Sequence, residues 1–424
     1  TIYKMLSSAE NSAAHNHLLS AGTLEPASWA KIVVLLLALC AGPAAPMGER
    51  PAVPERFARH GDEAMLVKSL LNIERGQLDS ALNAIDAVLA VNPNFRLAQL
   101  VRGDLLLAHA RALDSFGGAS GAPADFIAGL RDEARARIRH SMSQTPRDRV
   151  PRYLAQLNSD QRYALVVDTG RARLYLYRND AGIPRYAGDF YISIGKNGAQ
   201  KLREGDQKTP VGVYFVSGEV PKSALSDFYG AGAFPLDYPN EWDKRLGKNG
   251  SGIWLHGTPT DTYSRPPRAS NGCIVLSNAD LSTLSEVLRV GATPVIIDTD
   301  IEWVDFTQMA QRRELLNNRI ENWRRDWAKL DTERYLRHYS TAFRGQGYDY
   351  VRWTEHKRRV NARKQSLDVT LSNISMFSYP NADDLMVVTF EQRYHSNDLS
   401  SKMLKRQYWR LEDGRWKIIY EGAA

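Results

Sequence analysis

The feature that most constrains the fold and chemistry of this chain is one cysteine and one histidine. Each lies at one end of a short apolar segment. Residues 253–256 end in His256, and Cys273 follows a Ser-Asn-Gly turn and opens the apolar residues 274–276. The chain has 2 cysteines, and the other, Cys40, lies in a hydrophobic N-terminal stretch, so we expect no internal disulfide. An adjacent imidazole raises the thiolate population of a cysteine at neutral pH. The pattern predicts acyl transfer through Cys273, and an inert buried cysteine is the alternative.

Alternating apolar and polar segments separated by turn residues surround this pair. The long stretch 217–251, with many glycines, prolines and aromatics, is predicted to form a lid over the site. This pattern favours a mostly-β sandwich or barrel over a parallel α/β sheet. We expect strands at residues 164–168, 173–177, 185–194, 213–216, 253–256 and 294–298, and a helix at 278–288.

Three landmarks in this region resemble the L,D-transpeptidase catalytic-domain family, whose members are cysteine enzymes of bacterial peptidoglycan. The first is the strand pair ALVVDTGRARLYLY, and the second is the Thr-Pro-Val-Gly turn at residues 209–212. The third is the His-Gly pair at His256 together with the Gly-Cys pair at Cys273. The resemblance covers residues 162–298 and implies the sandwich or barrel fold of that family.

The resemblance also assigns roles to residues on both sides of the loop. It makes Cys273 the nucleophile and His256 the general acid and base, and the backbone N–H groups of Asn271, Gly272 and Cys273 hold the oxyanion. Either Ser270 or Asn271 can orient the imidazole, and the sequence does not choose between them. The substrate-binding candidates are Gly257, Arg265, Arg268 and Ser270.

Two positions depart from the family's pattern. Asn271 stands where the family has a histidine before Gly-Cys, and Val275 stands where many members have an arginine. The oxyanion donors are backbone groups, so they survive the first change, and Arg265 or Arg268 supplies a cation in place of the second. The same departures motivate an alternative function, a catalytically silent scaffold that binds peptidoglycan.

For an active enzyme, the resemblance implies attack on the L,D bond of a tetrapeptide stem, at meso-diaminopimelate, with release of D-Ala. An amine acceptor gives cross-linking by transpeptidation, and water gives L,D-carboxypeptidase trimming to a tripeptide. The combination with the C-terminal domain described below resembles a subgroup that includes L,D-carboxypeptidases involved in cell shape, which favours hydrolysis in cell-wall remodelling.

The amino-acid composition narrows the classes of molecule that this protein is expected to bind. The net charge of +7 fits an anionic wall polymer or membrane surface as well as an ordinary basic surface. No basic tract with interleaved aromatics predicts nucleic-acid binding. The histidines and cysteines have no strong metal-ligand spacing, so the sequence predicts no metal and no cofactor.

Residues 1–61 predict an exported protein. Lys31 precedes an apolar stretch that closes in small residues, which is typical of a signal-peptide core and short for a membrane span. A cleaved signal, an inner-membrane anchor and a lipid attachment at Cys40 remain open. A tether rich in Pro, Arg and Glu follows at residues 46–61. We therefore expect a periplasmic protein.

Residues 62–158 predict a helical region. Its apolar spacing indicates helices at 62–113 and 124–144, and Gly76 and Pro93 fall where a tetratricopeptide unit has its turn glycine and terminal proline. Such a short module either docks a protein partner or packs against the catalytic domain, which we place at residues 159–300.

Residues 301–424 predict a separate domain with helices followed by a strand meander. The pattern resembles the nuclear-transport-factor-like (SnoaL-like) cone, an α+β fold with many roles, so the resemblance implies architecture alone. Asp413-Gly414 is a strong hairpin signal. The expected helices lie at residues 306–329, 332–339 and 351–362, and the expected strands at 366–377, 385–395, 402–412 and 415–420.

Overall fold

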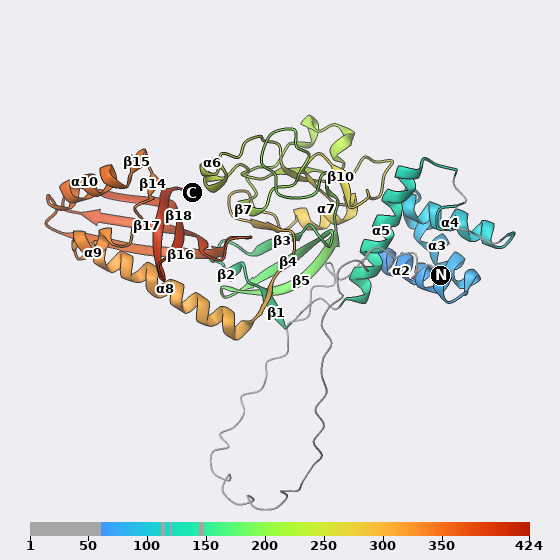
Figure 1. The fold of residues 1–424 in the computed structure, drawn as a ribbon, viewed down its shortest axis with the longest axis horizontal. Coiled ribbons are helices and arrows are strands. Elements are labelled where there is room, and N and C mark those ends of the chain that lie inside the picture. Colours follow the sequence, from blue (N-terminus) through green and yellow to red (C-terminus); the bar gives the residue numbers. More distant parts are fainter. Residues whose placement is uncertain (1–60, 112–114, 119–120, 144–147) are drawn as a thin grey trace, which may run out of the picture. The chain divides into compact units, whose positions relative to one another are not determined.

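The structure, a computed structural model, describes residues 61–111, 115–118, 121–143 and 148–424 (Figure 1). The predicted export segment and tether, up to residue 60, lie outside these described residues. None of the helices in the described ranges is both long and apolar enough to cross a membrane.

Four helices make up the first region, as its apolar spacing predicts. The turn between α2 and α3 contains Gly76 at φ +72°, a left-handed conformation that glycine adopts without strain. Leu66, Ile85 and Val101 are fully buried in the core that the helices share. The helices are confirmed, and the likeness to a tetratricopeptide unit stays a prediction. Their bounds are Gly61–Glu74 (α2), Leu78–Val91 (α3), Arg96–Ala108 (α4) and Ala124–Met142 (α5).

The main sheet of the second region has five strands in the order β5-β4-β3-β12-β7. β3, β4 and β5 are consecutive antiparallel neighbours, whereas β12 returns parallel to β3 and antiparallel to β7. Successive residues of β12 are all buried, so side chains cover both faces at the sheet centre. The strands are Tyr163–Asp168 (β3), Arg173–Asp180 (β4), Ile183–Tyr191 (β5), Gly212–Phe215 (β7) and Pro294–Asp298 (β12).

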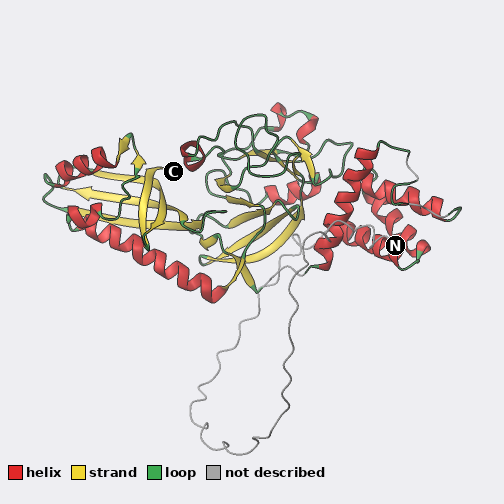
Figure 2. Cartoon of the chain, viewed as in Figure 1, coloured by secondary structure: helices red, strands yellow, loops and turns green. Residues whose placement is uncertain are grey.

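Smaller sheets complete this region and carry the predicted site. β11, β9 and β8 form one of them, β10 pairs with β6, and an isolated bridge joins Ser193 to Val275. Together with the main sheet they confirm the mostly-β architecture (Figure 2). The remaining elements here are Ile194–Gly195 (β6), Lys222–Ala224 (η2), Asp227–Tyr229 (η3), Ala233–Pro235 (β8), Glu241–Arg245 (α6), Trp254–His256 (β9), Arg268–Ser270 (β10), Ile274–Val275 (β11) and Asn278–Ser285 (α7).

The third region is the predicted cone of helices and a meander. The long helix α8 packs against the sheet that β16 to β19 form (Figure 1). Asp413 and Gly414 both have positive φ in the turn between β18 and β19, which confirms the hairpin prediction. Its elements are Trp303–Asp305 (β13), Phe306–Ala328 (α8), Thr332–Leu336 (α9), Arg344–Gly345 (β14), Tyr348–Asp349 (β15), Tyr350–Asn361 (α10), Leu367–Ser378 (β16), Leu385–Ser396 (β17), Ser400–Glu412 (β18) and Arg415–Ala423 (β19).

The segment that leads into the catalytic region adds two strands that the sequence did not predict. β1, Arg149–Pro151, pairs with β13, and β2, Leu154–Gln156, becomes the fifth strand of the cone sheet by pairing with β16. The pattern was missed because each strand has only three residues and its partner lies far away in sequence. These strands connect the catalytic region to the cone.

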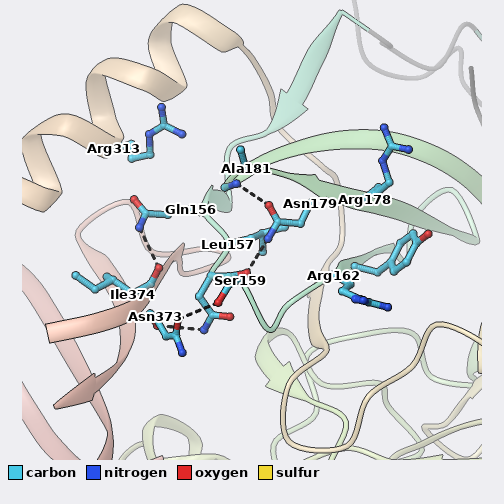
Figure 3. A pocket seen from close by; sticks show the side chains of 13 residues that line it. Gln156, Leu157, Ser159, Arg162, Arg178, Asn179, Ala181, Arg313, Asn373 and Ile374 are labelled. Atoms are coloured by element: carbon cyan, nitrogen blue, oxygen red, sulfur yellow. Dashed lines mark hydrogen bonds between the residues drawn. The ribbon is translucent and has the colours of Figure 1, made fainter. Parts of the chain in front are cut away.

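A polar cleft of about 820 Å³ lies at this connection (Figure 3). The amide of Gln156 donates to the Ile374 carbonyl at 2.9 Å, which ties β2 to β16. Arg162, Arg178 and Arg313 line the cleft. It opens at the β4–β5 turn, whereas the other end of β5 leads toward Cys273 through the Ser193 bridge, so this cleft lies away from the predicted site.

Candidate active site

Two neighbouring parallel strands bring His256 and Cys273 together. β9 ends at His256, β11 begins directly after Cys273, and the ladder pairs Val275 with His256. Cys273 comes one residue before this ladder begins. If the strand spacing continued for that one residue, it would separate the Cα atoms of Cys273 and His256 by about 8 Å. A thiol and an imidazole can bridge this spacing.

The imidazole of His256 is fixed at one nitrogen and enclosed by aromatic rings. Nδ1 lies 2.7 Å from the carbonyl oxygen of Gly257, and because a carbonyl only accepts, Nδ1 carries the proton and Nε2 is the basic nitrogen. The rings of Phe228 and Tyr229 lie 5.8 and 5.2 Å from the imidazole. Burial lowers the pKa of His256 to about 4 against the opposing Gly257 hydrogen bond, and nearby Arg265 lowers it further. The ring is therefore neutral at pH 7.

Two hydroxyl groups fix the turn that presents Cys273. Ser270 Oγ donates to the Cys273 carbonyl at 2.6 Å and accepts from the Gly272 N–H at 3.1 Å. Thr209 Oγ1 donates to the Gly272 carbonyl at 3.0 Å. Gly272 has φ +127°, and a Cβ there would lie 2.8 Å from a backbone oxygen, so the turn requires glycine. The Thr-Pro-Val-Gly and Ser-Asn-Gly-Cys motifs thus meet at Gly272.

The thiol of Cys273 is partly buried and protonated at rest. Its Sγ lies 3.3 Å from the Gly252 carbonyl, to which it donates. Burial raises the pKa of Cys273, while the Trp254 N–H, Arg265 and Lys201 each act to lower it. The sequence predicted a thiolate stabilised by the imidazole. The structure gives a neutral pair instead, because burial disfavours the charged form of both groups.

The two arginine candidates differ in their relation to the pair. The Arg265 guanidinium lies 4.8 Å from the ring of Phe228, and its charge acts on both the imidazole and the thiol. Arg268 is exposed on β10. Of the two, Arg265 is the arginine whose charge acts on the reacting groups. It can therefore replace the arginine that many family members have at the position of Val275.

The other candidates belong to the turns on either side of the pair. Asn271 is exposed at the tip of the cysteine turn, whereas Ser270 is buried and holds that turn. A Cβ on Gly257 would lie 2.2 Å from the side-chain oxygen of Asn278, so the missing side chain makes room for Asn278. The orienting partner of the imidazole is the Gly257 carbonyl, not Ser270 or Asn271. The oxyanion and substrate roles of these residues stay predictions.

Residue-by-residue reading of the sequence missed three contributors to the site. Lys201 is 3% exposed, pairs with Asp206 at 2.8 Å and acts on the thiol from the loop after β6. Phe228 and Tyr229 pack around the imidazole from the segment predicted as a lid. The glycine- and aromatic-rich composition predicted a lid in this segment, but nothing local identified the residues that touch the histidine.

These groups can perform proton transfer and nucleophilic attack. A thiol beside a neutral imidazole with a free Nε2 can pass its proton to that nitrogen, and two nearby cations favour the thiolate that results. In the described part of the chain, no three His, Cys, Asp or Glu side chains are arranged to hold a metal ion.

The comparisons with known proteins agree with this geometry. The family model of the L,D-transpeptidase catalytic domain matches residues 162–297. The structure of Bd1075 from Bdellovibrio bacteriovorus is similar at 30% sequence identity and a TM-score of 0.58, over 65% of this chain and 98% of that chain. This chain belongs to the L,D-transpeptidase catalytic-domain family. The recognition of that family from the sequence is confirmed.

The C-terminal domain is also matched. The family model of the Cds6 C-terminal NTF2-like domain covers residues 315–422, which confirms the nuclear-transport-factor-like prediction. The helical cell shape determining protein Pgp2 from Campylobacter jejuni is similar at 27% identity and a TM-score of 0.54, over 63% of this chain and 93% of that chain. A search of curated proteins gave no match.

Proposed function

We propose that this protein is an exported enzyme that cleaves the L,D bond of peptidoglycan stem peptides through Cys273, with water as the main acceptor. It would trim tetrapeptides to tripeptides in cell-wall remodelling. The family of the catalytic domain supports a peptidoglycan substrate. Similarity over 93% of a protein described as determining helical cell shape supports a role in shape. The N-terminal segment predicted for export supports a periplasmic location.

One observation carries the proposal. Cys273 comes directly before β11, which pairs in parallel with the strand that ends at His256, and Nδ1 of the histidine is already committed to the Gly257 carbonyl. Nε2 is therefore the nitrogen that receives the thiol proton. A cysteine kept only for packing would need neither this tautomer nor the nearby cations.

Acylation begins from the neutral pair. The thiol proton of Cys273 moves to Nε2 of His256 as the sulfur attacks the diaminopimelate carbonyl and a tetrahedral oxyanion forms. The C–N bond then breaks, the D-Ala amine leaves with the proton from the imidazolium, and a thioester remains on Cys273. The neutral imidazole is regenerated at the end of this half.

Deacylation uses the same groups in the opposite order. Nε2 of His256 takes a proton from water, the hydroxide oxygen adds to the thioester carbonyl, and the C–S bond breaks. The proton returns to the sulfur, so the products are a tripeptide carboxylic acid and the free thiol. With an amine in place of water the same steps give a cross-link.

The two departures from the family's pattern are compatible with this chemistry. Arg265 places a cation near the thiol. The site therefore keeps a positive charge, although Val275 stands where many family members have an arginine. The exposed Asn271 lies at the tip of the turn, whose shape depends on Ser270, Thr209 and Gly272. A preorganised donor in such a turn contributes roughly 3–4 kcal/mol to an oxyanion.

The decisive experiment is a digest of purified tetrapeptide muropeptides followed by mass spectrometry. We expect loss of one D-Ala and little cross-linked dimer, with no product from Cys273→Ala. Dimer as the main product would replace hydrolysis by transpeptidation. An unchanged mass with both the native protein and the variant would overturn the enzymatic function and favour the silent scaffold.

A further inference from the structure

The loop of residues 257–267 follows the histidine of the reacting pair and is bound to the helical region. The N–H of Tyr263 donates to the Asn94 carbonyl at 3.2 Å. The Asn94 side chain donates in turn to the Thr260 carbonyl at 3.1 Å. The centre of the Tyr263 ring lies 4.4 Å from that of Phe95, which is buried in the core of the helical region. The turn between α3 and α4 therefore fixes two separate points of this loop.

A buried ion pair of α5 holds the next part of the loop. Ser264 Oγ donates to a Glu133 oxygen at 2.6 Å, and Arg137 pairs with the same oxygen at 2.9 Å. The Arg137 guanidinium lies 3.9 Å from the centre of the Tyr191 ring, whose hydroxyl donates to the Arg265 carbonyl at 3.0 Å. The Glu133 and Arg137 side chains are 1% and 4% exposed. Because separating buried charges from their partners is costly, these contacts hold the loop in one position.

The same ion pair is tied to the main sheet of the catalytic domain. Arg137 also pairs with Glu63 of α2 at 3.0 Å, and Arg173 of β4 donates to Glu63 at 3.0 Å. Arg173 lies 3.4 Å from Asp189 of β5, and both of these side chains are 1% exposed. The helical region thus packs against the sheet through buried charges of alternating sign.

The loop also holds the aromatic rings that enclose the imidazole. While the Thr260 carbonyl accepts from the helical region, the Thr260 N–H donates to the Asp227 carboxylate at 3.2 Å. Asp227 is the first residue of η3. The Phe228 and Tyr229 rings of η3 lie 5.8 and 5.2 Å from the imidazole of His256. A continuous series of contacts therefore leads from the helical region to the basic group of the site.

Arg265 is the charged residue of this loop that acts on the reacting pair. Its guanidinium lies 4.8 Å from the centre of the Phe228 ring, which packs on His256. Its backbone is fixed at the carbonyl by Tyr191 and at the preceding residue by α5. Its charge acts to lower the pKa of both His256 and Cys273. Since a Coulomb interaction weakens with distance, the position of the loop sets how strongly Arg265 favours the thiolate.

We propose that Glu133 and Arg137 of α5 are positioning residues of the active site. They hold the loop so that Arg265 stays against Phe228, next to the reacting pair. This inference rests on the proposed function and deepens it, because the helical region lies outside residues 162–297, which the model of the catalytic domain matches. The helical region then contributes to catalysis without touching the substrate.

The test measures the pKa of the Cys273 thiol in the intact chain. The rate of alkylation by iodoacetamide is followed over a range of pH on the peptide that contains Cys273, by mass spectrometry. Arg265→Gln gives the reference and should raise the thiol pKa by about 0.5 or more, which slows alkylation about 3-fold below that pKa. Glu133→Gln should raise it by a similar amount, because Arg265 would no longer be held. In the Arg265→Gln background, Glu133→Gln should add little.

The sign of the change separates a movement of Arg265 from a direct effect of charge. Glu133→Gln removes a negative charge, and on its own this loss lowers the pKa of a thiol or leaves it unchanged. A raised thiol pKa therefore reports that Arg265 has moved. Ser264→Ala removes the same hydrogen bond without changing any charge and leaves Glu133 paired with Arg137. It should also raise the thiol pKa, and it decides the test if Glu133→Gln does not fold.

Ile127→Val is the matched control for a general loss of stability. Ile127 is buried on α5 and packs in the core of the helical region. Loss of one methyl group should lower the thermal midpoint about as much as loss of the Ser264 hydroxyl, with no change of charge. The thiol pKa of this variant should equal that of the native protein. An equal rise in Ile127→Val and Ser264→Ala would overturn the specific role of the ion pair.

The outcomes also separate this inference from the function on which it rests, because alkylation requires no substrate. If muropeptides stay unchanged while the thiol pKa moves as expected, the proposed function fails and the coupling of α5 to the thiol stands. If the native protein cleaves muropeptides and both Glu133→Gln and Ser264→Ala keep the native thiol pKa, the positioning role is overturned. The same holds if Arg265→Gln leaves the thiol pKa unchanged, or if Glu133→Gln raises it equally in the Arg265→Gln background.

Discussion

The catalytic domain and the cone each bury a small polar cluster, but the two clusters hold their charges differently. In the cone, Glu421 is fully buried and pairs with Lys405 at 2.5 Å. Gln407 and Tyr339 donate to its other oxygen at 2.8 and 2.9 Å. Burial alone would raise the pKa of Glu421, but Lys405 and Lys357 hold it below its usual value. This cluster is ionised.

In the catalytic domain, burial outweighs the charges that lie near the reacting groups. Burial raises the pKa of Cys273 and lowers that of His256 to about 4, so both are neutral at pH 7. The comparison teaches that burial with a counter-charge gives a stable ion pair. Burial that outweighs the nearby charges leaves a proton that can move during a reaction.

The largest expected effect comes from removing the thiol. Cys273→Ala should lower the rate of muropeptide cleavage by about 10³-fold or more, because nothing replaces the nucleophile. The thermal midpoint should stay close to that of the native protein, since the thiol is not part of a charged cluster. Product analysis and calorimetry check the two parts, and substantial residual cleavage would contradict the role of Cys273.

The next effect is on stability and belongs to the cone. Glu421→Gln leaves Lys405 buried without its counter-charge and should cost about 3 kcal/mol of folding free energy, measured by urea denaturation. Glu391→Gln is the control, because Glu391 pairs with Lys402 at the exposed surface. If both variants unfold at the same urea concentration, the cone cluster is not stabilised by its charges.

The pH dependence of stability should show the depressed pKa of His256. Between about pH 6.5 and about pH 4 the unfolded chain binds a proton that the folded chain does not, so stability falls as the pH falls through this window. The loss is on the order of 3 kcal/mol. His256→Gln should remove this part of the slope in denaturation measured at several pH values. His395→Gln, at an exposed position, should retain it.

The smallest effect concerns the turn that presents the cysteine. Ser270→Ala removes the acceptor of the Gly272 N–H and the donor to the Cys273 carbonyl, and should cost about 1 kcal/mol of stability. Cleavage should slow as well, because the turn would no longer be held in one shape. Denaturation and kcat on the same preparation check this, and an unchanged kcat would show that Thr209 alone fixes the turn.

Much of the fold could be predicted from the sequence because its signals are local. Alternation predicted β3 and β4, helical spacing predicted α8, and Asp413-Gly414 predicted the last hairpin, all within a few residues of the observed bounds. The pairing of Cys273 with His256 could be predicted from motif order, since His256 ends one short strand and Cys273 comes directly before another.

Only the tertiary structure decided how that pair behaves. The neutral resting state, the contribution of Lys201 and the aromatic rings around the imidazole depend on burial and on residues brought together from separate loops. The same is true of β2, which joins the cone sheet, and of the helical region, which holds the Arg265 loop. Local sequence determines backbone conformation, whereas electric charge and solvent exclusion act through space and are fixed only when the chain has folded.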